Sequence, residues 1–125
     1  MDCGLSVIVL ELVDSNGNNL IENGTFTAEE IRVLENNEDV GRVSEQLSSG
    51  APNVISIVPR GSLSPTYEVI LNDTTTGILE AELFITLESE CCGTFFGVRS
   101  ANYNDVPILN ITQESEDATR IVIVL

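Results

Sequence analysis

Short aliphatic runs recur along the whole chain, separated by turn-forming residues, and this spacing constrains the fold more than any other feature. The runs are rich in Val, Ile and Leu, which favour extended structure. Clusters of Asn, Asp, Ser, Thr and Gly stand between them, and such residues bond their own backbone in turns. We predict strands over residues 5–13, 30–34, 40–44, 54–58, 67–71, 78–88, 94–100, 108–112 and 118–125. A capping signature at Thr27 predicts a single helical turn at most, so the chain predicts an all-β domain.

The clearest periodicity lies in residues 78–88, where apolar and polar side chains alternate with one interruption at Phe84. A period of two turns one set toward the core and the other toward water. The predicted core set is Ala81, Leu83, Ile85 and Leu87. A sheet with one solvated face favours antiparallel pairing. We therefore predict a single domain over residues 1–125, an antiparallel β-sandwich of about seven to nine strands, with a small β-barrel as the second choice.

Charge excludes several classes of partner. Acidic residues outnumber basic ones by 20 to five, which gives a net charge of −15. Nucleic acids and anionic membranes attract clustered cations, whereas the five basic residues are scattered: Arg32, Arg42, Arg60, Arg99 and Arg120. No apolar run is long enough to predict a transmembrane segment. Repulsion between acidic copies favours a monomer.

The residues that most often carry catalysis are missing. The sequence has no His and no Lys, so it cannot assemble a Ser-His-Asp triad, a Cys-His pair or a lysine Schiff base. No glycine-rich phosphate loop is present either. We predict a protein that is not an enzyme. A small hydrolase that uses paired Glu residues is the alternative, and a concave pocket holding two carboxylates would favour it.

Three cysteines bear on the compartment. Cys91 and Cys92 are adjacent, and neighbouring cysteines bond each other only in a strained ring. The sequence thus favours a disulfide from Cys3 to one of them. The alternation of the preceding strand puts Cys91 on the core side with Leu87, so Cys91 is the predicted partner and Cys92 the alternative. Two other interpretations stay open, a lipid on Cys3 and three reduced thiols in the cytoplasm.

A disulfide predicts an oxidising compartment outside the cytoplasm: the periplasm, the cell surface or the medium. Met1 stands directly before Asp2 and a strand-like run. We interpret the chain as a mature domain with an added initiator Met, from which a targeting segment has been removed.

One turn places oxygen-bearing side chains at alternating positions, as calcium loops do. They are Asp14, Asn16 and Asn18, with Glu22 further along. The pattern departs from an EF-hand, which needs Gly where Asn19 stands and Glu where Thr25 stands. Two interpretations remain, a calcium site on those four residues and an Asx-rich connection with no ligand.

Aromatic residues gather after the cysteine pair. Phe95, Phe96 and Tyr103 could form a patch that stacks on a sugar or docks a partner. The alternative is that one of the two adjacent Phe side chains faces the core and that the other needs no ligand.

Three stretches resemble uncharacterised extracytoplasmic domains of bacterial lipoproteins. They are LELVDSNGNNL at residues 10–20, FTAEEI at 26–31 and ECCG at 90–93. The resemblance implies an immunoglobulin-like or transthyretin-like sandwich in the periplasm or at the cell surface, and it carries no functional residue with it. One departure is that no tether separates Cys3 from the first strand, which puts a lipid anchor in question.

These observations favour a non-catalytic structural or interaction module outside the cytoplasm. Such a module would engage a protein or a glycan through its strand edges and loops. A calcium-dependent binding or adhesion domain, with the loop at Asp14 stiffened by metal, is the second hypothesis.

Overall fold

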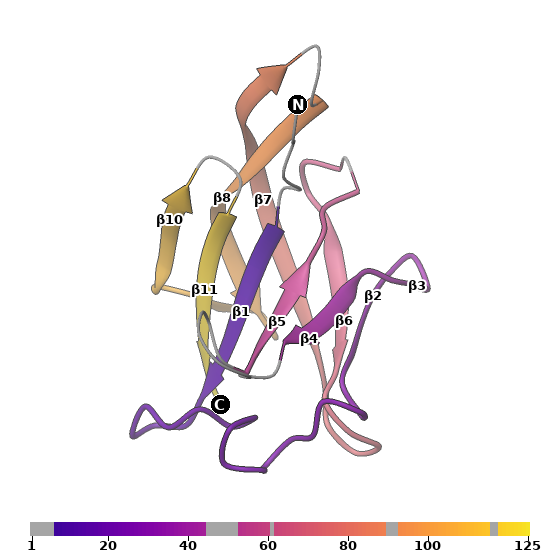
Figure 1. Cartoon of the computed structure of the whole chain (residues 1–125), viewed down its shortest axis with the longest axis vertical. Helices are drawn as coiled ribbons and strands as arrows, with labels where there is room; N and C mark the ends of the chain where they lie inside the picture. The colour runs from indigo at the N-terminus through magenta and orange to yellow at the C-terminus, as the bar shows by residue number, and fades with distance from the viewer. Residues whose placement is uncertain (1–6, 45–52, 61, 90–92, 116–117) are drawn as a thin grey trace.

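The chain forms a β-sandwich (Figure 1). The computed structural model describes residues 7–44, 53–60, 62–89, 93–115 and 118–125. It is all-β, with 60% strand and no helix among those residues, and two mostly antiparallel sheets pack against each other. No helix in the described ranges is long and apolar enough to cross a membrane. The predicted fold class is confirmed.

The five-stranded sheet has the order β10-β11-β1-β5-β4. Its strands are β1 (Val7–Val13), β4 (Gly41–Ser44), β5 (Val54–Ile57), β10 (Ile111–Ser115) and β11 (Ala118–Val124). All its neighbours are antiparallel except β1 and β11, which run parallel from Val7 beside Ala118 to Val13 beside Val124. Both of these strands are nearly continuous aliphatic runs, as parallel strands usually are.

The six-stranded sheet has the order β3-β2-β6-β7-β8-β9 and is antiparallel throughout. Its strands are β2 (Arg32–Glu35), β3 (Glu38–Asp39), β6 (Thr66–Ile70), β7 (Thr76–Ser89), β8 (Gly93–Tyr103) and β9 (Val106–Pro107). Each predicted strand overlaps a strand of the structure, and β3 and β9 are short additions. The strand predicted at 108–112 begins later, at Ile111.

Aliphatic side chains from the inner faces of both sheets fill the core. The largest fully buried side chains are Tyr67, Ile8, Leu10, Leu12, Ile55, Ile57, Leu71, Leu79, Ile121, Val33 and Val69. Residues 27–30, which precede β2, form a single turn, in which the Glu30 N–H donates to the Thr27 carbonyl at 3.1 Å. The predicted limit of a single helical turn is therefore correct.

The alternation predicted for β7 holds for only part of the strand. Ala81 and Leu83 are buried, but Ile85 is 46% exposed. The ladder between β6 and β7 ends at Glu80, and on that side the N–H groups of Ala81 and Leu83 bond further along, to the Pro65 and Leu63 carbonyls at 3.1 and 2.7 Å. Further along, the paired ends of β7 and β8 form an arm that rises past the other strands at the top of Figure 1. The prediction that Ile85 faces the core was wrong, because the pairing of β7 with β8 shifts register on both sides of it, between Glu82 and Leu83 and between Ile85 and Leu87, which interrupts the regular alternation.

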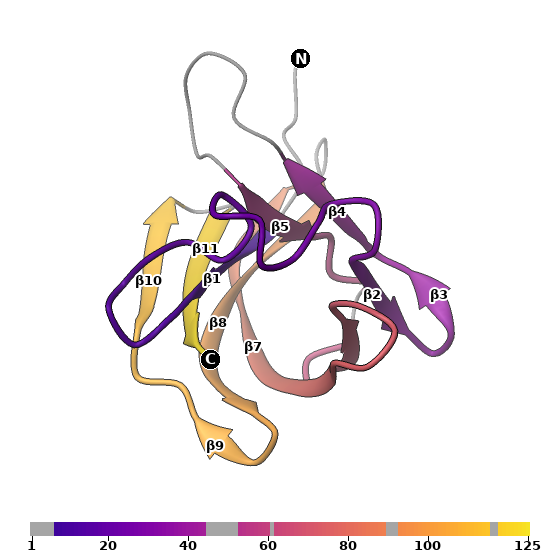
Figure 2. The same cartoon turned by 90° about the horizontal axis from the view of Figure 1, so that it is seen from below.

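The chain passes from one sheet to the other at Val40, between β3 and β4. The Val40 N–H donates to the Val33 carbonyl of β2 at 2.9 Å, and the Val40 carbonyl accepts from the Val58 N–H at 3.2 Å. Gly41 allows this close approach, because a Cβ there would lie 2.8 Å from the Val33 Cβ. Figure 2 shows β2, β3 and β4 together on the side away from β9 and β10. This crossing joins the two sheets along one side.

Candidate anion-binding pocket

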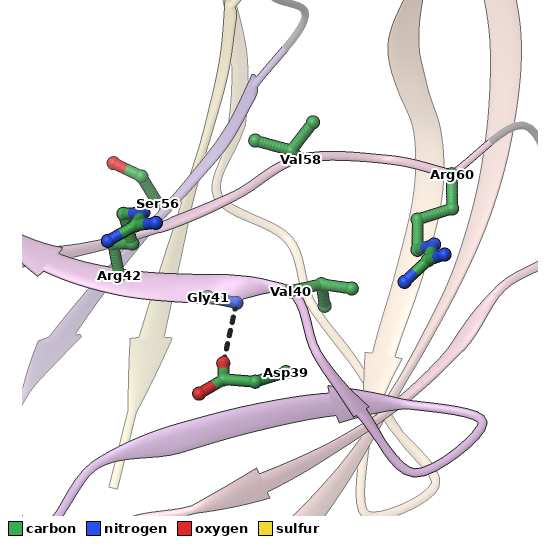
Figure 3. Close-up of a pocket in the computed structure, with 7 residues that line it drawn as sticks. All are labelled: Asp39, Val40, Gly41, Arg42, Ser56, Val58 and Arg60. Carbon is green, nitrogen blue, oxygen red and sulfur yellow. Dashed lines mark hydrogen bonds between the residues drawn. The ribbon is translucent and has the colours of Figure 1, made fainter.

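A cavity of about 470 Å³ opens beside the crossing between the sheets (Figure 3). This volume is within the range of small-molecule sites. We call it the arginine pocket, and it is lined by Asp39, Val40, Gly41, Arg42, Ser56, Val58 and Arg60.

Strand alternation explains why Arg42 reaches the pocket. Gly41 faces inward toward Val33, and Val43 packs against the core, so Arg42 between them points outward. The antiparallel pairing of β4 with β5 places Arg42 directly opposite Ser56. A guanidinium and a hydroxyl therefore stand together on the outer face of the sheet.

The residues that follow β5 complete the pocket. Figure 3 shows Arg42 and Ser56 at one end, Arg60 at the other, and the side chains of Val40 and Val58 between them. Val58 is 38% exposed. The pocket thus has two cationic ends and an aliphatic middle.

The two arginines differ in how they are paired. Arg60 forms an ion pair with Glu38. Arg42 is exposed and forms no ion pair with any residue in the described part of the chain. A guanidinium presents a planar fork of N–H donors that matches a carboxylate or another oxyanion. Arg42 is the group in this pocket best able to bind one.

The remaining acid of the pocket is partly committed to the fold. The Asp39 carboxylate accepts the Gly41 N–H at 3.1 Å, which fixes the start of β4 (Figure 3). Ser56 has no imidazole or amine beside it, because the sequence contains neither His nor Lys. A serine without such a base is a weak nucleophile. The lining is suited to holding an anion by charge and hydrogen bonds.

The residues predicted to bind calcium form a hydrogen-bonded turn. One oxygen of Asp14 accepts the N–H groups of Asn16 and Asn18, at 2.8 and 2.9 Å, and its other oxygen accepts the Asn18 amide at 3.1 Å. These bonds, first that of the Asn18 backbone, lower the pKa of Asp14. Glu22 belongs to the next turn, where its N–H donates to Asn19.

This geometry fits the Asx-rich connection. No group of three or more acidic, Cys or His side chains that could hold a metal ion occurs among the residues described. Two of the four predicted calcium ligands, Asn16 and Asn18, are amide side chains and do not belong to those residue types. The calcium site therefore stays a prediction.

The three aromatic residues do not share a surface. Tyr103 is 8% exposed, and its ring lies over Gly77, where a Cβ would overlap the hydroxyl. Burial raises the pKa of Tyr103. Phe95 and Phe96 lie toward the opposite end of β8, both are half-buried, and Phe96 packs against the core. Tyr103 therefore belongs to the core and cannot contribute to a surface patch with them.

A second, shallow hollow holds two carboxylates. Glu80 and Glu82, neighbours on the outer face of β7, line a cavity of about 130 Å³ together with Ser100 and Asn102. Sites for small ligands usually exceed about 300 Å³. The two acids are adjacent, but the hollow is smaller than such sites.

The predicted disulfide cannot be placed. Cys3, Cys91 and Cys92 all lie outside the described residues. The pairing of Cys3 with Cys91, and the alternative with Cys92, stay predictions.

Sequence reasoning missed the arginine pocket because Arg42 and Arg60 are far apart in the chain. A signal was present nonetheless. Two of the predicted strands, 40–44 and 54–58, are consecutive, and consecutive strands usually pair. Pairing them as a hairpin would have brought Arg42 toward the residues that follow the second strand.

Comparison with known proteins adds no assignment. No family model, curated protein or solved structure matches the chain. The likeness to lipoprotein domains remains a prediction from the sequence.

Proposed function

We propose that this protein is a non-catalytic interaction module, located outside the cytoplasm, that holds an acidic group of a partner in the arginine pocket. The observation that carries the proposal is the exposed Arg42 guanidinium, which lines a ligand-sized cavity and has no acid paired with it among the described residues. In a chain with only five basic residues, two of them line this one cavity.

The lining favours an acidic peptide over an acidic glycan. Sugars are commonly held by stacking on aromatic rings, and none of the residues that line the arginine pocket is aromatic. Val40 and Val58 instead place aliphatic surface between the two arginines (Figure 3), which suits the short stem of an Asp or Glu side chain. We therefore assign a peptide carboxylate as the ligand.

The proposed location rests on the sequence. Three cysteines, one of them placed before the first strand, suit a disulfide and hence an oxidising compartment. The resemblance to lipoprotein domains points the same way. A mass measurement of the native protein before and after reduction tests this part, and three free thiols in the untreated protein would contradict it.

Nuclear magnetic resonance titration of the whole chain tests the pocket. The probe is a capped tetraglutamate peptide, with tetraglutamine and oligogalacturonate as comparisons. We expect saturable shifts at the Arg42 side-chain N–H with tetraglutamate, weakened by added salt because exposed charges are screened. Arg42→Gln should weaken binding about tenfold, as loss of a charge-assisted hydrogen bond does.

Arg99→Gln is the matched control, because Arg99 lies over the Phe84 ring, 5.9 Å from its centroid, outside the pocket. Equal weakening by Arg42→Gln and Arg99→Gln would mean that only net charge matters and would refute the pocket. Stronger binding of oligogalacturonate would replace the peptide with a glycan. If tetraglutamine bound with the same affinity as tetraglutamate, the carboxylate would have no role in binding.

A further inference from the structure

The arginine pocket lies beside an open sheet edge. Strand β4 is the last strand of the five-stranded sheet and pairs only with β5 in the described part of the chain. An edge strand presents backbone N–H and C=O groups that can pair with another extended chain. The pocket and the edge share Gly41 and Arg42.

Backbone alternation shows which groups of β4 are open. The Val58 N–H donates to the Val40 carbonyl at 3.2 Å. Because antiparallel pairing alternates, Arg42, two residues after Val40, also turns its backbone groups toward β5. Gly41 and Val43 turn theirs away. The Gly41 N–H is occupied by the Asp39 carboxylate, which leaves the Gly41 carbonyl and both backbone groups of Val43 facing outward.

Side chains on β4 give this edge a chemical preference. Arg42 stands on the outer face of the sheet, while Gly41 and Val43 face the core side. A strand added beside β4 would place a residue next to Arg42, at the short cross-strand distance of about 5 Å. A guanidinium favours an acid at that position.

The other described edges suit an added strand less well. Strands β3 and β9 have two residues each, and the parts of β7 and β8 that extend past β6 and β9 pair with each other through two register shifts. Strand β10 is longer, but its pairing with β11 shifts register between Gln113 and Ser115, and such irregularities bend an edge away from further pairing. Only β4 combines regular pairing with a cation that has no described acid partner.

We infer that the partner of the arginine pocket is an extended acidic segment that adds to the five-stranded sheet as a strand beside β4, with its carboxylate on Arg42. This inference rests on the proposed function. Backbone pairing supplies the attachment, and the position of Arg42 sets the register, since a shift by one residue would turn the acid to the opposite face.

Backbone methylation of a peptide tests the inference. The probe is a capped pentapeptide, Thr-Val-Glu-Val-Thr, titrated into the whole chain at millimolar concentration and followed by nuclear magnetic resonance. Three further peptides each carry one backbone N-methyl group, at one of the three central residues. A strand pairs through alternate residues, so methylation at one parity should weaken binding about tenfold, and methylation at the other should change it less than about threefold.

Signals of the protein itself give a second measure of strand addition. The Val43 amide should shift and exchange more slowly with solvent when the peptide is present, whereas the Arg99→Gln variant should behave as the unmodified protein does. Suppose that peptides methylated at either parity bind equally well while replacement of Glu by Gln still abolishes binding. That result would overturn strand addition and leave the proposed function of the pocket intact. Binding that ignores both Arg42→Gln and the Glu-to-Gln change would overturn the proposed function itself. Absence of any peptide shift would overturn the inference.

Discussion

On the outer face of the five-stranded sheet the acid of the central strand is paired with a base, whereas three glutamates on the outer face of the six-stranded sheet have no ion-pair partner among the described residues. Glu11 of β1 accepts a hydrogen bond from Arg120 of β11 at 2.5 Å, with less than a third of either side chain exposed. Around this ion pair lie Val7, Val9 and Val122, all half-buried. This face is mainly aliphatic.

The outer face of the six-stranded sheet follows a different pattern. Glu68, Glu80 and Glu82 point outward between buried neighbours, and none forms an ion pair with a residue in the described ranges. Arg99, on the same sheet, lies over the Phe84 ring instead. The acids on the two outer faces are therefore paired differently. Arg42 of the arginine pocket stands on the outer face of the five-stranded sheet, where Glu11 is paired with Arg120.

Truncation of the core should have the largest effect and should not distinguish the sheets. Leu10 on β1 and Leu79 on β7 are both fully buried. We expect Leu10→Ala and Leu79→Ala each to lower the free energy of unfolding by about 2–5 kcal/mol, measured by chemical denaturation. A loss below about 1 kcal/mol in either variant would show that its sheet does not contribute to a shared core.

Replacement of Glu11 should distinguish the outer faces. Glu11→Gln removes the carboxylate that accepts from Arg120 in a partly buried setting, so we expect a loss of about 1–2 kcal/mol in unfolding free energy. The salt dependence of stability should fall in this variant. A change indistinguishable from zero would mean that the ion pair does not stabilise the aliphatic face.

One substitution inside the six-stranded sheet should run against the usual trend for core residues. The Tyr67 hydroxyl and one carboxylate oxygen of Glu35 are buried and have no hydrogen-bond partner within the described part of the chain. Burial, and then the charge of Glu35, raise the pKa of Tyr67, so this hydroxyl remains protonated well above neutral pH. We expect Tyr67→Phe to leave the unfolding free energy unchanged or to raise it by up to about 1 kcal/mol, since it removes an unsatisfied polar group. A loss above about 1 kcal/mol would show that the hydroxyl has a partner in solution.

The smallest effect should come from the unpaired acids. Glu80 lies two residues from Glu82 on the same face of β7, a separation of about 7 Å along a strand. Glu80→Gln should therefore raise the unfolding free energy by a few tenths of a kcal/mol at low salt, and by less at high salt. Glu11→Gln serves as the comparison, since it should change stability in the opposite direction. A loss in both variants would remove the distinction between the faces.

Local patterns in the sequence predicted elements well and contacts between distant elements less well. The alternation of residues 78–88 correctly placed Ala81 and Leu83 in the core, because side chains of one strand depend mainly on its own period. It failed at Ile85, which lies between two register shifts of the β7–β8 ladder that the period of the sequence does not reveal. The parallel pairing of β1 with β11 was not predicted, since nothing local specifies which distant strands become neighbours.

The candidate site was harder to predict for the same reason. Arg42 and Arg60 line the same pocket only because β4 pairs with β5 and because Gly41 lets the chain cross between the sheets. The residues singled out from the sequence lie within short stretches, as Asp14, Asn16 and Asn18 do, and the structure shows them bonding one another. Residues that are close in the sequence could be identified as turns. Identifying the pocket required knowledge of which strands pair.

The parallel pair at the centre of the five-stranded sheet also determines how the molecule bears mechanical load. Val7 sits beside Ala118 at one end of the pair, and Val13 sits beside Val124 at the other. Tension applied between Val7 and Val124 pulls β1 and β11 in opposite directions along their length, so every rung of this ladder is stretched at once instead of being peeled open one by one. Forced unfolding is governed by the rate of that first rupture, and shear across a full ladder makes the rupture slow.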